Sequence, residues 1–207
     1  TRPPAGNAPP AAPMARTSRP DVASLLARVQ ALGRKPDIVR ADLDAAEALL
    51  DQAARLDPTD AAVWAERAIV DWCQFQEKFD ASSARLDSAR RNARQALAFD
   101  SDNPRARLAE AASLLATNNY DAKTKTEAIR ILEPLAARAD ADVETLLLLA
   151  SLRQDPAHYD VALGYMDRAA RLPGGAGAAH FTRSLACFER GEWAQATEAI
   201  DRALGAE

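Results

Sequence analysis

The chain has 207 residues, of which 48% are hydrophobic, 27% are charged and only 5% are aromatic, and its formal net charge is −4. This length and apolar content are sufficient for a full hydrophobic core. The acidic balance argues against a nucleic-acid-binding protein, because few cationic side chains are left to neutralise phosphates. No apolar run approaches the roughly 20 residues of a membrane-spanning helix, so we expect a soluble protein without membrane insertion.

The beginning of the chain differs in composition from the rest. Residues 1–20 are rich in proline and alanine and show no apolar periodicity. Such a segment cannot build a packed element and is typical of an extended, disordered linker. It either connects the following residues to an upstream domain or is a mature N-terminus after cleavage.

Helical periodicity begins at residue 21 and continues through the chain. Alanine is abundant and no stretch alternates cleanly with period two, which favours an all-α protein. In residues 21–60, Val22, Leu26 and Val29 share one helical face. The later pair Asp57-Pro58 can end a second helix. The segment 21–60 therefore predicts one helical hairpin.

Four more segments of the same character follow. We expect one hairpin in each of residues 61–103, 104–142, 143–176 and 177–207. The second segment exceeds a repeat period of about 34 residues by about nine, and the excess falls around residues 76–80. The last two segments align with each other at that period. Ala162, Met166 and Ala169 recur as Ala196, Ile200 and Ala203.

These recurring positions resemble the tetratricopeptide repeat family over about residues 41–207. Trp64 stands at the family's early aromatic position, and Gly191-Glu192-Trp193 stands at its turn between two helices. The family has a small residue late in the first helix of each hairpin. In this chain the residues at that position are Ala68, Ala111, Ala150 and Ser184. The resemblance implies an all-α fold, a right-handed α-solenoid of about five helical hairpins over residues 21–207.

The sequence offers no catalytic constellation. Its two histidines, His158 and His180, do not pair with cysteines or carboxylates at metal-ligand spacing, and no glycine-rich phosphate loop is present. Cys73 and Cys187 belong to distant hairpins, so we expect free thiols rather than a disulfide. We therefore expect no catalytic residue, no metal, no cofactor and no enzymatic activity.

The resemblance also implies a concave groove lined by the first helix of each hairpin. Some family members clamp a partner's terminal carboxylate there with lysine, asparagine and arginine, whereas the equivalent positions here lack lysine and asparagine. The residues predicted to line the groove are instead apolar: Ile69, Trp72, Leu108, Leu115, Leu147, Phe181, Leu185 and Phe188. Either an amphipathic helix or apolar peptide of a partner binds these residues, or the superhelix is tight and they pack on each other or on the chain's own ends.

The leading hypothesis is a non-enzymatic scaffold that binds a protein or peptide in this apolar groove. The alternative is a regulatory, sensory or dimerisation module of a larger bacterial signalling or transcription-regulating polypeptide, because the array is similar to those of multidomain bacterial regulators. For either hypothesis the compartment stays open between a bacterial cytoplasm and a periplasm. No polar capping helix follows residue 204, which makes the C-terminal edge a candidate homodimer interface.

Overall fold

The computed structural model describes residues 18–35, 37–118 and 120–206, and every regular element among them is an α-helix. The ten helices of this part of the chain are α1 (Pro20–Gly33), α2 (Arg40–Leu56), α3 (Ala61–Gln76), α4 (Ser83–Phe99), α5 (Pro104–Thr117), α6 (Ala122–Ala136), α7 (Val143–Leu152), α8 (Tyr159–Ala170), α9 (Ala176–Glu189) and α10 (Trp193–Leu204). They confirm the all-α fold. Residues 1–17 lie outside the described ranges, so the linker expected at 1–20 stays a prediction there, while Pro20 already begins α1.

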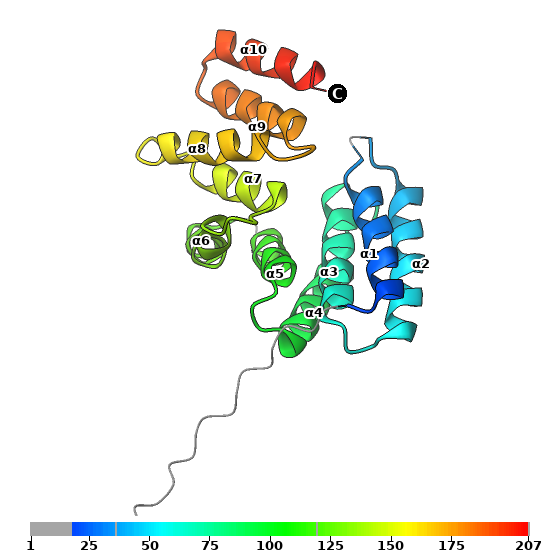
Figure 1. Cartoon of the computed structure of the whole chain (residues 1–207). Helices are drawn as coiled ribbons and strands as arrows, with labels where there is room; N and C mark the ends of the chain where they lie inside the picture. The colour runs from blue at the N-terminus through cyan, green and yellow to red at the C-terminus, as the bar shows by residue number, and fades with distance from the viewer. Residues whose placement is uncertain (1–17, 36, 119, 207) are drawn as a thin grey trace, which may run out of the picture.

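Consecutive helices pair as hairpins, and the hairpins stack into a curved solenoid (Figure 1). The odd-numbered helices line the inner side of the curve in Figure 1. Helix α1 also contacts α3, α3 contacts α5, and α7 contacts α9. The inner surface is therefore built from the first helix of each hairpin.

Polar side chains set the starts of the helices in the middle of the array. Each accepts a hydrogen bond from a backbone N–H group in the first turn, as Asn103 Oδ1 does from Ala106 at 3.0 Å. Such a bond satisfies an N–H group that the first turn of a helix leaves unpaired. The residues that begin α3 to α7 in this way are Asp60, Ser82, Asn103, Asp121 and Asp142.

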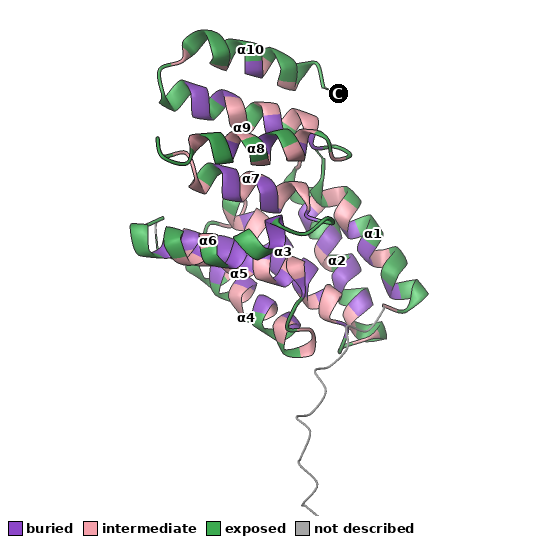
Figure 2. Ribbon diagram, turned by 60° about the vertical axis from the view of Figure 1, so that its left-hand side comes forward, coloured by how far each residue is buried: buried purple, intermediate pink, exposed green. Residues whose placement is uncertain are grey.

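Small residues allow the close helix crossings that the repeat pattern predicts. Ala68, Ala111 and Ala150 have no exposed surface. The repeated small positions of the even-numbered helices are equally buried from α2 to α8: Ala46, Ala53, Ala89, Ala93, Ala96, Ala128, Ala162 and Ala169. In α10, Ala196 and Ala203 are only half-buried, because α10 packs on α9 at the end of the described array (Figure 2).

The hydrophobic core continues from hairpin to hairpin. A central cluster that includes Leu108, Leu132 and Leu146 joins α5, α6 and α7. A second cluster joins α1, α2 and α3, and Cys73 packs against both clusters. Each hairpin thus depends mainly on its neighbours, as in other solenoids.

Two glycines form the turn between α8 and α9. Gly174 has a φ angle of +72°, a conformation that favours glycine. Gly175 has an ordinary φ of −90°, but a Cβ atom there would lie 2.0 Å from the carbonyl oxygen of Ala169. The last two hairpins therefore approach each other at a point where no side chain fits.

Candidate partner-binding site

Three of the predicted groove residues lie in the core. Ile69 is 8% exposed, Leu108 is 1% exposed and Leu115 has no exposed surface. All three belong to the central cluster. They pack on each other and on their neighbours, which is the second of the two interpretations of the groove. In this conformation they offer no surface to a partner.

Trp72 and Leu147, two further predicted groove residues, are half-buried, so they are neither core residues nor fully exposed. Leu147 packs against the central cluster and against the cluster of α7, α8 and α9. The Nε1 atom of Trp72 is buried and has no hydrogen-bond partner among the described residues. Leu147 therefore contributes to packing more than to the surface.

The remaining three predicted residues form an exposed apolar stripe on α9. Phe181 is 50% exposed, Leu185 is 49% exposed and Phe188 is 60% exposed. Their spacing of four and three residues places them on one face of the helix. We call these three residues the α9 stripe.

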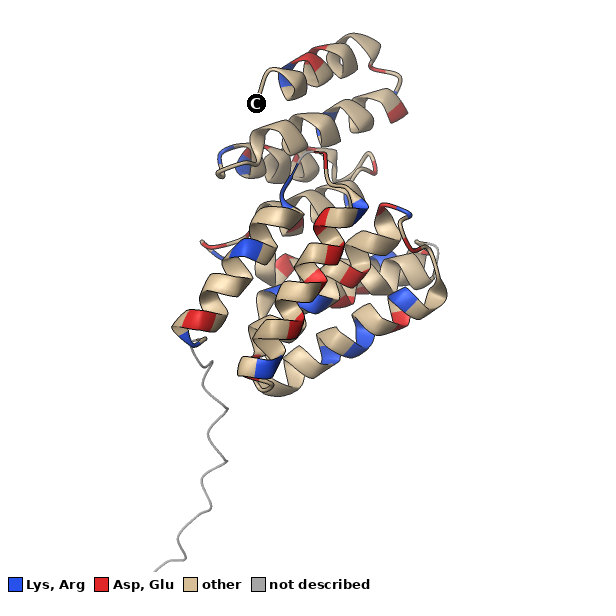
Figure 3. Ribbon diagram, turned by 90° about the vertical axis from the view of Figure 1, so that its right-hand side faces the viewer, with Lys and Arg blue, Asp and Glu red and all other residues tan. Residues whose placement is uncertain are grey.

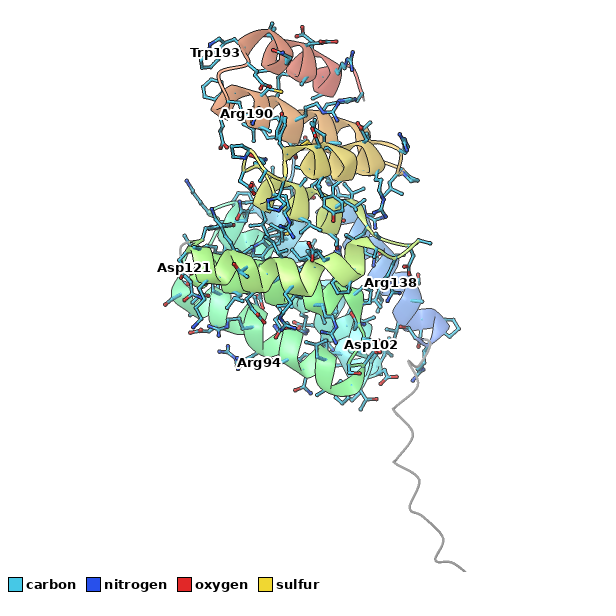
Figure 4. The ribbon with its side chains drawn as sticks, turned by 90° about the vertical axis from the view of Figure 1, so that its left-hand side faces the viewer. Arg94, Asp102, Asp121, Arg138, Arg190 and Trp193 are labelled. Atoms are coloured by element: carbon cyan, nitrogen blue, oxygen red, sulfur yellow. The ribbon has the colours of Figure 1, made fainter. Side chains whose placement is uncertain are left out.

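Trp193 extends the α9 stripe beyond the end of the helix. Its ring meets that of Phe188 edge to face, with centroids 5.1 Å apart, and it is 60% exposed. Gly191 has a φ of +74° and reverses the chain between the two aromatic residues. Figure 4 shows Trp193 at the turn between α9 and α10. The sequence predicts Trp193 only as part of the hairpin turn, and Phe188 on the other side of the same short turn is the signal for its place on the surface.

A polar network crosses the inner surface next to the core. Glu66 on α3 accepts hydrogen bonds from Gln30 Nε2 on α1 at 2.8 Å and from Arg105 Nε on α5 at 3.2 Å. Arg105 Nη1 also lies 3.3 Å from Asp142 Oδ2 and 3.6 Å from Glu144 Oε1 at the start of α7. One guanidinium group therefore connects three odd-numbered helices.

Arg105 is firmly protonated in this network. Burial lowers the pKa of its guanidinium, but the negative charge of Glu66 and of the α7 carboxylates raises it, and the net shift is upward. Glu66 is only 2% exposed. A buried carboxylate is stable when a cation and hydrogen bonds compensate its charge. Arg105 therefore stabilises the contact between α3, α5 and α7, and its guanidinium group is not free to bind a partner's carboxylate.

Two acidic residues lie at the ends of α7 and α9. Asp155 accepts a hydrogen bond from His158 Nδ1 at 2.8 Å, and this bond lowers the pKa of the Asp155 carboxyl group. Glu189 directly follows Phe188, is exposed, and forms no ion pair or side-chain hydrogen bond with any described residue. Glu189 therefore leaves an unpaired negative charge beside Phe188, at the end of the α9 stripe.

The nearest cation does not neutralise Glu189. Arg190 Nε lies 2.8 Å from Glu192 Oε1, and its guanidinium carbon lies 4.0 Å from the centre of the Tyr159 ring. Figure 4 places Arg190 on the same turn as Trp193. Over the array as a whole, charges of both signs are interspersed in the view of Figure 3.

Two small clefts lie away from the α9 stripe. One, of about 240 Å³, is lined by residues of α8, α9 and α10, among them Tyr159, His180 and Arg183. The other, of about 200 Å³, lies between α2, α3 and α4. Their arginines are already paired, as Arg183 is with Asp167 at 2.6 Å and Arg85 with Asp71 at 2.7 Å. Cys187 also lines the first cleft, where its Sγ lies 3.7 Å from the Tyr159 hydroxyl oxygen, and no hydrogen bond joins it to His180 in the described part of the chain.

The described residues contain no group of three or more His, Cys, Asp or Glu side chains that could hold a metal ion. Cys73 and Cys187 are both free thiols, as predicted. None of the described helices is sufficiently long and apolar to cross a bilayer.

Comparisons with known proteins assign no family to the chain. No family model matches it, and no curated protein does. A solved structure described as the crystal structure of MamA is similar over 80% of this chain and 89% of that chain, with 14% sequence identity and a TM-score of 0.49. A likeness of this strength establishes neither a family nor a function.

Proposed function

We propose that the chain is a non-enzymatic scaffold that binds a peptide or helix of a partner protein on the α9 stripe and Trp193. The observation that carries this proposal is the exposure of four large apolar side chains in one place, each close to half exposed or more. Together the three half-exposed aromatic rings present roughly 300 Å² of surface. Contiguous apolar patches of this size on a soluble protein are often interaction sites, and aromatic residues are frequent anchors of binding.

The rest of the molecule supports an interaction role rather than a catalytic one. Ile69, Leu108 and Leu115, three of the eight predicted groove residues, are buried in the central cluster, while α9 packs on α7, α8 and α10 and keeps its stripe exposed. The arginines that line the clefts are held in ion pairs, as Arg85 is with Asp71 and Arg183 with Asp167. The binding surface is thus proposed to be smaller than the groove expected from the sequence, and to lie at the C-terminal end of the array.

The test compares partner capture by the wild type with capture by the double variant Phe181→Glu/Phe188→Glu. Val161→Glu is the matched control, because Val161 is 47% exposed on α8, outside the stripe. We expect the double variant to lose at least about tenfold in captured partner while its melting temperature stays within a few degrees of the wild type. Equal capture of the same proteins by the wild type and the double variant would contradict the proposal.

Self-association at the same end of the array is the second candidate. Leu204, at the end of α10, is 71% exposed, and Trp193, at its start, is 60% exposed. Sedimentation velocity over a hundredfold range of concentration tests it, with Leu204→Glu/Trp193→Glu as the variant. A wild-type monomer at every concentration would remove this candidate.

A further inference from the structure

We infer that the partner segment recognised by the α9 stripe is a basic amphipathic helix. This inference rests on the proposed function and adds the chemistry of the ligand to it. It follows from the charge around the stripe, from the spacing of its apolar side chains, and from the absence of backbone groups that could pair with an extended peptide.

The charge of the surrounding inner surface is negative. Glu189, beside Phe188, is exposed and has no ion-pair partner among the described residues, whereas the cations of α9 and its turn are paired, Arg183 with Asp167 and Arg190 with Glu192. Arg105 is shared among the carboxylates of Glu66, Asp142 and Glu144. Beside the α9 stripe the charge left without a partner is thus negative, which attracts lysine and arginine and repels an acidic or phosphorylated segment.

The negative charge is concentrated at one end of the stripe. Helix α9 ends at Glu189, and Asp155 follows the end of α7 at Leu152. The carbonyl ends of both helices add partial negative charge there, since the helix dipole is negative at the C-terminus. We therefore place the basic residues of the partner beside Phe188 and Trp193, and its apolar residues toward Phe181.

The spacing of the stripe matches a helical ligand. Phe181 and Phe188 are seven residues apart, which is about 10 Å along a helix axis at 1.5 Å per residue. A helix laid along this line presents apolar side chains with the same i, i+4, i+7 periodicity. An extended peptide would gain no backbone hydrogen bonds from the stripe, because the backbone of α9 is already hydrogen-bonded within the helix.

A second copy of this chain does not fit the description. Its most basic helix is α4, with Arg90, Arg91 and Arg94. The apolar face of α4, however, is buried within its own array, as Leu86 and Ala89 show. A folded copy cannot present both the apolar and the basic face of that helix, so the occupant is a segment of a different protein.

The experiment uses the full chain and three synthetic 18-residue helical peptides as probes. All carry leucine at positions i, i+4, i+7 and i+11, and their polar faces consist of lysine, glutamine or glutamate. Fluorescence anisotropy measures the Kd of each peptide at low and at high salt. We expect the lysine peptide to bind at least about tenfold more tightly than the glutamate peptide at low salt, with a smaller difference at high salt because ions screen exposed charges.

Variants separate this inference from the proposed function. Phe181→Glu/Phe188→Glu removes the apolar stripe, and Glu189→Lys/Asp155→Asn removes the acidic border. A matched control, Asp44→Lys/Asp87→Asn, makes the same change in net charge on α2 and α4. We expect the first two variants to weaken binding of the lysine peptide about tenfold and the control to leave it unchanged.

Each contrary outcome has a distinct meaning. Equal binding of the three peptides, lost only in Phe181→Glu/Phe188→Glu, would overturn the inference and leave the proposed function standing. Preference for the glutamate peptide, or no binding of any peptide at about 100 µM, would also overturn it. A dimer that the same double variant dissociates would identify a second copy as the occupant and overturn it as well.

Discussion

Substitution of Gly175 by alanine should loosen the junction between the last two hairpins. A Cβ atom at this position would lie 2.0 Å from the carbonyl oxygen of Ala169, 3.0 Å from its carbonyl carbon and 3.0 Å from Val143 Cγ2. Two of these atoms belong to the backbone of α8, so no side-chain rotation relieves the contact. The φ of Gly175 is −90°, which alanine tolerates, and the cost is therefore steric.

The magnitude follows from the effect of overpacking. An extra methyl group in a well-packed site typically costs about 1–3 kcal/mol. For a domain of this size, each kcal/mol lowers the melting temperature by roughly 2–4 °C, so Gly175→Ala should melt about 2–12 °C below the wild type.

Gly164→Ala is the matched control. Gly164 lies inside α8 and a Cβ atom there would meet nothing within 4 Å. The same chemical change should therefore stabilise the protein by about 0.5–1 kcal/mol, because alanine favours the helix. The two variants should change the stability in opposite directions. Gly175→Ala should lower it and Gly164→Ala should raise it, although each variant adds one methyl group.

Thermal unfolding followed by circular dichroism measures the stability, and hydrogen exchange locates the change. In a solenoid each hairpin is coupled mainly to its neighbours, so amide protection should fall in α8, α9 and α10 and persist in α1 to α4. A Gly175→Ala protein as stable as Gly164→Ala, or a loss of protection spread evenly over the array, would refute this reasoning.

Three further predictions concern charge and burial. Arg105→Met should lower the free energy of unfolding in urea by about 3–5 kcal/mol, because Glu66 would remain buried without its cation. Hydrogen bonds from Thr124 hold the pKa of Asp121 below its ordinary value. The stability that Asp121 contributes is thus complete above about pH 4 and is lost as the pH falls through its lower folded pKa; acid titration of the wild type and Asp121→Asn measures this. Burial raises the pKa of the Cys73 thiol to about 12, so at pH 8 it should react with iodoacetamide roughly a thousandfold more slowly than in the unfolded chain, as peptide mass spectrometry can show.

Repeated local patterns carried enough information to predict the fold class. Small residues such as Ala68 and Ala111 recur at the same point of successive hairpins, and the structure buries them completely. The pair Asp57-Pro58 predicted the end of a helix, and α2 ends at Leu56 in the structure. These signals act within a few residues of each other, and therefore a sequence pattern contains them in full.

The candidate site was less predictable. Glu66 and Arg105 are 39 residues apart in sequence, and no local pattern indicates that they form a buried ion pair. Trp193 contacts Phe188 because Gly191 turns the chain between them. Both contacts depend on how hairpins and turns are placed in space.

The sequence by itself determined where the helices lie, which small residues let them cross, and that apolar side chains recur on the first helix of each hairpin. Only the tertiary structure decided which of those apolar side chains reach solvent. Leu108 and Phe181 occupy the same position in two hairpins, yet Leu108 is 1% exposed and Phe181 is 50% exposed. The reason is which face the neighbours cover, since each of the two helices contacts three others. Helices α3, α4 and α6 pack around α5 in the middle of the array and bury Leu108, whereas α7, α8 and α10 pack on other faces of α9 and leave its stripe exposed. Burial depends on the whole stack of helices, and no single repeat contains that information.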